Sequence, residues 1–574
     1  MKQIVIIGFT LFLNLSLLGQ AIQSATPIFS SEVRHHPIVA DNGMVASQHA
    51  LATEVGLEIL KKGGNAVDAA VAVGFSLAVV LPRAGNLGGG GFMMIYDEKS
   101  NSTDALNYRE MAPAKAHRDM YLNKDGDVDR RLVNSDYLSV GVPGSVAGMC
   151  KALEMHGSMS LAEVMAPAIR QAEEGFVVTY DLARILKSLE NRIRQCPESE
   201  KIFFKEDGGY YEAGDILIQK DLAWSLKQIA QHGPKAFYNG EVGQRIVDDM
   251  KQNNGFITMK DLNNYKVEEG KPVWGEYRGY DIASMPPPSS GGVHIIQMLN
   301  ILEAFPLGYL GHNTAETLHL MAESMKYAYA DRSEHLGDPN FWDVPIDGIT
   351  SEEYGREISS KLNRWMATPS DQINPGTPED YESEETTHFT VVDKEGNVVV
   401  NTYTLNFSFG TGIVAKGTGI ILNNEMSDFS AKPGVANAFG LLGGEANAIN
   451  AGKRPLSSMT PTMIFKDGKP YVATGSPGGS RIITTVLQVI LNIIDHKMNV
   501  AEATHAARIH HQWYPDILFI EKGINQDTQS LLRAKGHNLK YRSAMGSTQT
   551  IMLKDGLMFG SSDPRRPDAK TSGY

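Results

Sequence analysis

Two adjacent threonines, Thr386 and Thr387, open a strand-like run late in the chain. A threonine hydroxyl is a weak nucleophile unless a base takes its proton, and the α-amino group of an N-terminal threonine can be that base. This arrangement requires a cut between Glu385 and Thr386. Threonine is also common in ordinary strands, so the pattern alone leaves a structural role open. It indicates a precursor that cleavage activates.

The segment before Thr386 differs in composition from the rest of the chain. Residues 368–385 contain six acidic residues, three prolines and no basic residue. Such a stretch buries too little apolar surface to order itself, so we expect a flexible linker. A β-hairpin is predicted next, from strands at 388–392 and 398–405. Thr404 lies on the returning strand, where its hydroxyl can reach back to that of Thr386.

Helical and strand-like patterns occur on both sides of this linker. Apolar residues at three- and four-residue spacing predict helices at 51–60, 66–80, 161–174, 221–231, 314–330, 481–494, 501–507 and 527–535, and another beginning near Val293. Asn65 is predicted to cap the second of these. Further strands are predicted at 92–96, 413–422, 462–466, 471–474 and 548–553. We therefore expect one layered α/β body, in which an internal linker favours processing over domain hinging.

The overall composition is that of a globular protein, with 42% hydrophobic and 21% charged residues among 574. The net charge of −13 argues against nucleic-acid binding, which needs clustered basic residues. Lys2, an apolar run over 4–18 and small residues thereafter predict a signal peptide at 1–25. That run is shorter than the about 20 residues of a membrane span. We expect an exported protein with no membrane span, in the periplasm or secreted to the medium.

No metal or cofactor pattern is visible. His49, His294 and His319 lack metal-ligand spacing and are expected to be structural. Cys150 and Cys196 can pair in an oxidising compartment, but two ordinary cysteines are the favoured interpretation. The glycine-rich run at 85–91 leads into a strand rather than a helix, so it is not a dinucleotide fingerprint. We expect neither a metal nor a cofactor.

Several longer motifs occur together in this chain, in a fixed order. They are Thr386-Thr387-His388, Thr402-Tyr403-Thr404-Leu405-Asn406, Phe409-Gly410-Thr411-Gly412, residues 422–429, Lys453-Arg454-Pro455-Leu456-Ser457-Ser458-Met459, and Gly475-Ser476-Pro477-Gly478-Gly479-Ser480-Arg481. With these motifs the chain resembles the γ-glutamyltranspeptidases over nearly its whole mature length. By that resemblance residues 26–385 are the large subunit and 386–574 the small catalytic subunit.

The resemblance implies an N-terminal-nucleophile hydrolase with a four-layer αββα sandwich built jointly by two autocleaved subunits. Thr386 would attack the Glu385 carbonyl during maturation. It would then act as the nucleophile toward the γ-glutamyl amide of glutathione and related compounds. Thr404 would position its hydroxyl, and the acyl group would pass to water or to amino acid and peptide amines.

A γ-glutamyl group carries a free carboxylate and a free ammonium, so its site must bind both signs of charge. By the resemblance, Arg109 would hold the carboxylate in a bidentate pair, with Ser457 and Ser458 sharing it. Glu425 and Asp428 would bind the ammonium. The remaining implied residues are Asn406, which assists, and Gly478 and Gly479, whose N–H groups would form the oxyanion hole.

One departure from the family and two alternatives remain. Residues 433–455 correspond to a lid loop in which bacterial members often carry a tyrosine, and Phe439 stands at that position here. A phenyl ring can cover a site by packing but makes no hydroxyl contact.

The alternatives are a cephalosporin or glutaryl acylase of the same superfamily, and a non-catalytic periplasmic binding protein. Retention of Glu425 and Asp428 argues against the acylase, because a glutaryl group has no ammonium.

Overall fold

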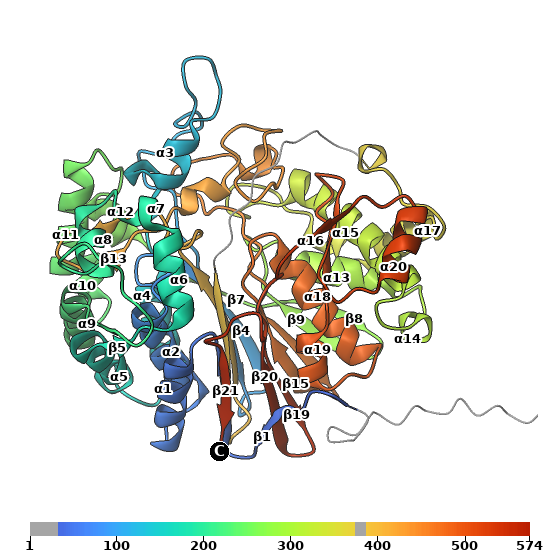
Figure 1. Cartoon of the computed structure of the whole chain (residues 1–574), viewed down its shortest axis with the longest axis horizontal. Helices are drawn as coiled ribbons and strands as arrows, with labels where there is room; N and C mark the ends of the chain where they lie inside the picture. The colour runs from blue at the N-terminus through green and yellow to red at the C-terminus, as the bar shows by residue number, and fades with distance from the viewer. Residues whose placement is uncertain (1–32, 374–385) are drawn as a thin grey trace, which may run out of the picture.

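A computed structural model of the chain describes residues 33–373 and 386–574. Within these ranges, two antiparallel sheets of seven strands each pack face to face between two helical layers (Figure 1). This confirms the expected αββα sandwich. The predicted signal peptide at 1–25, Glu385 at the predicted cut and the 374–385 part of the acidic segment lie outside the described residues.

The first sheet contains the predicted threonine hairpin at its centre. Its strands, in spatial order, are β21 Lys570–Gly573, β2 Gly43–Ser47, β10 Thr387–Asp393, β11 Val398–Thr404, β3 Gly90–Asp97, β4 Ser102–Tyr108 and β7 Glu268–Gly270. On one side β10 pairs with β2, with Thr390 opposite Ala46. On the other side β11 pairs with β3, with Thr404 opposite Gly90. Strands from before and after the acidic segment therefore share one hydrogen-bonded sheet.

The second sheet covers one face of the first. Its strands, in spatial order, are β1 Ile38–Ala40, β20 Leu557–Ser562, β19 Gln549–Lys554, β15 Lys469–Thr474, β14 Thr462–Lys466, β9 Tyr280–Ser284 and β8 Val273–Tyr277. Successive residues of a strand face opposite sides. Val391 accordingly packs in the core beneath the first helical layer, and Val392 in the core between the sheets. The central strands β10 and β11 are buried on both faces, and their polar residues are buried along with the apolar ones.

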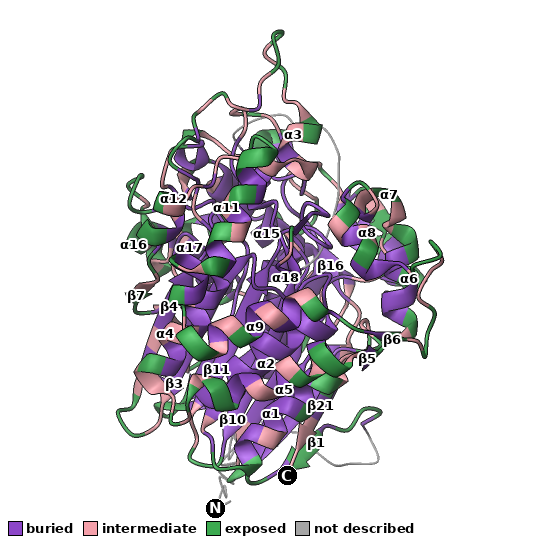
Figure 2. Ribbon diagram, turned by 90° about the vertical axis from the view of Figure 1, so that its left-hand side faces the viewer, coloured by how far each residue is buried: buried purple, intermediate pink, exposed green. Residues whose placement is uncertain are grey.

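Each sheet is covered on its outer face by helices (Figure 1). The layer over the first sheet contains α1 Ala50–Lys61, α2 Ala66–Val80, α4 Ser145–His156, α5 Leu161–Glu174, α9 Lys220–His232 and α11 Glu241–Gln252. The other layer contains α13 Gly291–Leu302, α15 Ala315–His335, α17 Glu352–Lys361, α18 Arg481–Ile494, α19 Val500–His505 and α20 Gln526–Ala534. All of α2 is buried (Figure 2), and Asn65 forms a capping box with Asp68 at its start. The predicted cap is thus confirmed.

Shorter elements connect these layers. The helices are α3 Arg130–Ser135, α6 Tyr180–Ser188, α7 Glu190–Ile193, α8 Pro197–Phe203, α10 Lys235–Tyr238, α12 Met259–Asn264, α14 Leu307–Leu310 and α16 Ile346–Ile349. The strands are β5 Phe176–Val177, β6 Ile216–Leu217, β12 Val414–Ala415, β13 Ile420–Ile421, β16 Ile509–His510, β17 Leu518–Ile520 and β18 Leu539–Tyr541. None of the described helices is both long enough and apolar enough to cross a membrane.

Two of the predicted elements differ from the structure. The single strand predicted at 413–422 is wrong: β12 and β13 pair antiparallel across a turn. Gly417 and Gly419 in this turn both have positive φ, which reverses the chain where a strand would continue. Helix α15 continues to His335, although its prediction ended at Ala330. Arg332 lies in the last turn of α15 and lines the same pocket as Thr386.

Candidate active site

Thr386 lies immediately before β10, at the point where the chain enters the central sheet. The register pairs Thr387 with Tyr403, which brings the two hydroxyls of Thr386 and Thr404 together. Their Oγ1 atoms are 3.4 Å apart, and the amide of Asn406 donates to Thr404 Oγ1 at 2.8 Å. Both threonines are buried. The two hydroxyls therefore face each other as expected, at a distance longer than the roughly 2.5–3.0 Å of an ordinary bond between hydroxyls.

Thr386 and Thr404 face a small polar pocket. Its lining is Arg109, Arg332, Thr386, Thr404, Asn406, Glu425, Asp428, Asn437, Phe439, Leu441, Ser457, Ser458, Met459, Gly479 and Ile482. All the predicted site residues within the described ranges are in this set except Gly478, which directly precedes Gly479. The cavity measures only about 20 Å³, room for about one water. A substrate therefore needs the covering side chains to move.

The segment at 433–455 supplies that cover. Phe439 lines the pocket, and its ring meets that of Phe407 edge to face at 5.9 Å. Its Cδ1 atom lies 2.8 Å from where a Cβ on Gly479 would stand, so only a glycine fits beneath the ring. Phe439 therefore covers the site by packing, as expected for a phenyl ring at this position of the lid loop.

Charged groups of both signs meet on one side of the pocket. Arg109 donates from Nη1 to Glu425 and from Nη2 to Asp428, and its Nε donates to the Pro455 carbonyl at 3.2 Å. Burial alone lowers the pKa of Arg109, but the two carboxylates outweigh it and raise this pKa. Arg109, predicted to hold a substrate carboxylate, is thus already paired with the two residues predicted to hold the ammonium.

Two carboxylate oxygens in the pocket have no partner among the described residues. They are Glu425 Oε2 and Asp428 Oδ1, both buried. An unpaired buried acceptor is costly, so such a pair is expected where a donor arrives from a ligand. Asn406 directs its side-chain amide to the Asn424 carbonyl and to Ser427 Oγ, which places it beside these acids. The arrangement can accept a cationic group such as an ammonium.

Three further lining residues, Ser457, Ser458 and Arg332, present donors. Ser457 and Ser458 are both buried, and Arg332 donates from Nη2 to Ser458 Oγ at 3.3 Å. Burial lowers the pKa of Arg332 to about 10, so the side chain stays cationic at neutral pH. A carboxylate of a small ligand fits against these groups. The pocket can therefore hold a zwitterion, with its cationic end toward Glu425 and Asp428.

Gly479 lines the pocket, and Gly478 directly precedes it in the chain. Both residues have positive φ, +134° and +55°, in the turn that leads into α18. Within the described part of the chain, neither N–H donates a hydrogen bond. Their carbonyls are used, since they accept from the amides of Arg481 and Ile482. Free backbone amides at a pocket are the kind of donor from which an oxyanion hole can be built.

Glu110 is a pocket neighbour that the sequence reasoning missed. It is fully buried, its two carboxylate oxygens have no hydrogen-bond partner among the described residues, and Arg109 Nη1 lies 3.5 Å away. Burial raises its pKa to about 7, against the lowering effect of Arg109. An acid directly after an arginine in sequence is ordinary on a surface, so only its burial identifies Glu110.

One histidine cluster has the composition of a metal site. His319, Glu323 and His537 place their ligand atoms within 4.8 Å of one another, and the first two lie one turn apart on α15. Their lone pairs are already in use: His319 and His537 bond at 2.8 Å, and Glu323 accepts from Lys326 and the Thr368 amide. The cluster acts as a hydrogen-bonded network. The other two histidines that were expected to be structural also form hydrogen bonds: His49 caps α1, and His294 bonds to Gln297.

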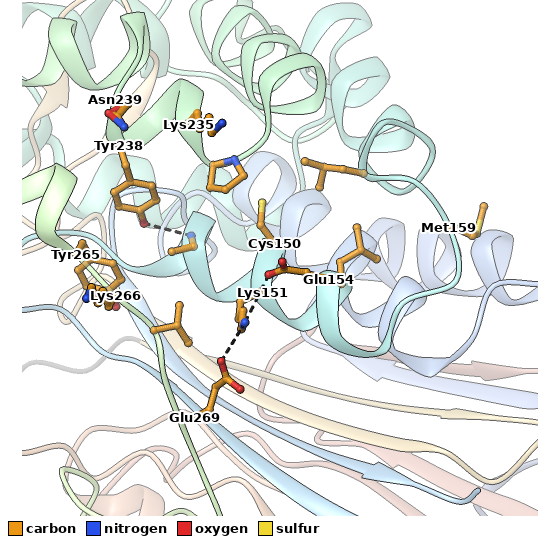
Figure 3. Close-up of a pocket in the computed structure, with 15 residues that line it drawn as sticks. Cys150, Lys151, Glu154, Met159, Lys235, Tyr238, Asn239, Tyr265, Lys266 and Glu269 are labelled. Carbon is orange, nitrogen blue, oxygen red and sulfur yellow. Dashed lines mark hydrogen bonds and ion pairs between the residues drawn. The ribbon is translucent and has the colours of Figure 1, made fainter. Parts of the chain in front are cut away.

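A second cavity measures about 710 Å³, and Cys150, Lys151, Tyr238 and Tyr265 are among the residues that line it (Figure 3). Tyr238 and Tyr265 form one wall, and the Tyr265 hydroxyl donates to the Arg109 carbonyl at 2.9 Å. Cys150 also lines it, but burial raises the pKa of this thiol to about 12, so it is no thiolate nucleophile. Cys150 and Cys196 are both free thiols. This larger cavity contains none of the predicted site residues.

The fold and the site together define a class. An antiparallel αββα body with a threonine at the entry to a central strand, facing a small polar pocket, is that of the N-terminal-nucleophile hydrolases.

Comparisons with known proteins agree. The family described as gamma-glutamyltranspeptidase matches residues 52–573. The glutathione hydrolase proenzyme of Escherichia coli K12 is 54% identical over 540 residues, 94% of this chain and 93% of the relative. The Helicobacter pylori gamma-glutamyltranspeptidase structure is 45% identical with TM-score 0.57, covering 60% of this chain and 97% of that one. A cephalosporin acylase from Bacillus halodurans is 28% identical with TM-score 0.84, covering 95% and 98%. The chain belongs to the γ-glutamyltranspeptidase family.

Proposed function

We propose that the chain is a self-processing γ-glutamyltransferase that cleaves the γ-glutamyl amide of glutathione and related compounds. The observation that carries the proposal is the pair of unpartnered buried oxygens, Glu425 Oε2 and Asp428 Oδ1, in the pocket that Thr386 lines. These two oxygens can accept hydrogen bonds from the α-ammonium of a γ-glutamyl group. Relatives named glutathione hydrolase proenzyme, at up to 54% identity, support the same activity.

Substrate recognition follows from the charges of the pocket. The α-ammonium binds Glu425 and Asp428, with Asn406 holding the neighbouring backbone in place. The α-carboxylate binds Ser457 and Ser458 and the free donors of Arg109. Arg109 has five N–H donors, and its hydrogen bonds to Pro455, Glu425 and Asp428 leave some of them for a ligand. The γ-carbonyl then lies toward Thr386.

The proposed reaction is acyl transfer in two halves. Thr386 Oγ attacks the γ-carbonyl while its own α-amino group takes the hydroxyl proton, and Thr404 holds the hydroxyl. The N–H groups of Gly478 and Gly479 stabilise the oxyanion. The amine leaves with a proton, and a γ-glutamyl ester of Thr386 remains. Water or the amine of an amino acid or peptide then attacks the ester and releases the threonine.

Maturation uses the same hydroxyl. Thr386 Oγ attacks the Glu385 carbonyl, an ester replaces the peptide bond, and water hydrolyses that ester to free the α-amino group. The products are a large subunit, 26–385, and a small subunit, 386–574. Because β10 and β11 pair with β2 and β3, the two subunits stay together. The proenzyme names of the relatives agree with such a cut.

Two further parts of the proposal concern other assignments. A signal peptide at 1–25 directs export, with the periplasm as destination.

An acylase is the second candidate, since the Bacillus halodurans cephalosporin acylase shares the fold at TM-score 0.84. Its identity of 28%, against 54% for the glutathione hydrolase proenzyme, and the free acceptors for an ammonium favour the transferase.

The first experiment examines the purified protein on a denaturing gel and determines the N-terminus of the smaller band. The proposal expects that band to begin Thr-Thr-His-Phe. Thr386→Ala should remain uncut and inactive. Assays of γ-glutamyl and glutaryl anilides side by side then separate the transferase from the acylase. A single uncut chain, or a normally processed Thr386→Ala variant, would refute the proposal, and turnover of the glutaryl compound alone would favour the acylase.

A further inference from the structure

Arg332 is a buried cation beside the pocket for which the reaction described above has no use. It extends from the last turn of α15, is 5% exposed and lines the pocket with Ser458. No carboxylate oxygen in the described parts of the chain lies within 4.0 Å of its guanidinium nitrogens. A buried charge without an ion partner is costly. Such a charge is expected where an anion arrives from outside the protein.

The hydrogen bonds of Arg332 run to two hydroxyls. Its Nε donates to Ser290 Oγ at 2.9 Å, and its Nη2 donates to Ser458 Oγ at 3.3 Å. A guanidinium only donates, so each of these hydroxyls must use its own hydrogen elsewhere. Ser290 donates its hydrogen to the Ser457 carbonyl at 2.8 Å. Ser458, in contrast, donates to no described residue, and its hydroxyl borders the pocket.

We propose that Arg332 is a positioning residue for the substrate carboxylate. It fixes the Ser458 hydroxyl as a donor directed into the pocket and places a positive charge behind that hydroxyl. The inference rests on the proposed function, because it takes the ligand to be the α-carboxylate of a γ-glutamyl compound. Arg109 does not replace this role, because its side-chain hydrogen bonds run to Pro455, Glu425 and Asp428 and not to Ser458.

The charge balance of the pocket supports this assignment. Arg109 and Arg332 lie beside three acids, Glu425, Asp428 and Glu110, and burial raises the pKa of each of them. A zwitterionic ligand adds no net charge to this group. Through Ser290 the same guanidinium also holds the backbone at Ser457. Arg332 therefore connects the end of α15 to both residues of the predicted carboxylate site.

The test compares two substrates that differ only at the α-carboxylate. One is γ-glutamyl p-nitroanilide, and the other is the same compound with its α-carboxylate converted to a neutral carboxamide. In Arg332→Gln we expect kcat/KM for the acid to fall about 10- to 100-fold, mainly through KM, and that for the carboxamide to change less than about threefold. Arg332→Lys should fall between wild type and Arg332→Gln, because an ammonium keeps the charge but not the planar fork that reaches both serines.

A double-mutant cycle and a matched control separate positioning from folding. Ser458→Ala should cost little more in the Arg332→Gln background, because the two act on one contact. Lys326→Gln is the control: Lys326 is a buried cation on the same helix, paired with Glu323 at 2.9 Å, and it does not line the pocket. This variant should lower thermal stability and leave the acid-to-carboxamide ratio unchanged.

The outcomes are separable. Equal losses on both substrates in Arg332→Gln would overturn the inference. If Arg332→Gln accumulates as uncut precursor, the same two substrates are compared in Arg332→Lys. An unchanged acid-to-carboxamide ratio in Arg332→Lys would also overturn the inference. If the wild-type protein does not turn over γ-glutamyl p-nitroanilide, the proposed function itself fails. In the remaining outcome, the wild type prefers the acid over the carboxamide, with the same acid-to-carboxamide ratio of kcat/KM in both Arg332 variants. That result would support the proposed function and refute only the role of Arg332.

Discussion

Asp428→Asn is the substitution that most directly tests how the pocket binds an ammonium. Asp428 uses Oδ2 for Arg109 and leaves Oδ1 without a partner among the described residues. Asparagine has nearly the same shape and can still accept one hydrogen bond, but it carries no charge. The variant therefore removes the attraction to the ammonium while largely preserving packing.

The expected size of the effect follows from the burial of the site. Removing one charge of a buried, hydrogen-bonded pair costs about 2–5 kcal/mol. Glu425 remains as a second carboxylate with a free Oε2, so the loss belongs at the lower part of this range. A loss of about 3 kcal/mol corresponds to roughly a 100-fold fall in kcat/KM for a γ-glutamyl anilide.

The assay measures kcat/KM for γ-glutamyl and glutaryl anilides with wild type and Asp428→Asn. The glutaryl compound has no ammonium, so its already low rate should change less than about threefold. Burial raises the pKa of Asp428, so the wild-type advantage should shrink as the pH falls and this carboxylate takes up a proton. Equal losses on both substrates would show that Asp428 supports the pocket without contacting an ammonium.

Three further variants probe other parts of the site. Thr404→Val removes the hydroxyl 3.4 Å from Thr386 Oγ1, so kcat should fall about 100-fold with KM nearly unchanged; a changed KM alone would contradict this positioning role. Gly479→Ala places a Cβ 2.8 Å from Phe439 at φ +55°, so kcat should again fall about 100-fold, and full activity would refute the oxyanion assignment. Burial raises the pKa of Glu110 from 4.5 to about 7, so the folded state holds a proton that the unfolded state releases, and wild-type stability falls as pH rises through that window. The Tm of Glu110→Gln relative to wild type should therefore rise by a few degrees between these pH values, and a constant difference would contradict the burial argument.

The parts of the fold that depend on local signals were predictable. Helix α2 has the predicted bounds because Asn65 caps it and apolar residues fill all its faces. The hairpin β10–β11 follows from alternation around a polar turn. The failure at 413–422 has a local cause too: Gly417 and Gly419 look like flexible residues in a strand, whereas the structure uses both in the left-handed region.

The site was only partly predictable, because it joins residues from distant parts of the chain. The motifs identified Thr386, Arg109 and Glu425, but not how they pair. Arg332 was not predicted as a site residue, because the apolar periodicity of its helix ends at Ala330, two residues before it. Likewise His319 meets His537, 218 residues further along the chain, a contact that no spacing pattern indicates.

The interleaving of β10 and β11 between β2 and β3 bears on how long the enzyme lasts. The precursor can assemble this sheet within a single chain. After the proposed cut, the same sheet is made of two separate polypeptides, and each lacks the neighbouring strands of the other. Recovery from unfolding then becomes a concentration-dependent encounter between fragments with exposed strand edges, which favours aggregation. The working lifetime of the mature enzyme is therefore set by its rate of opening rather than by a reversible equilibrium.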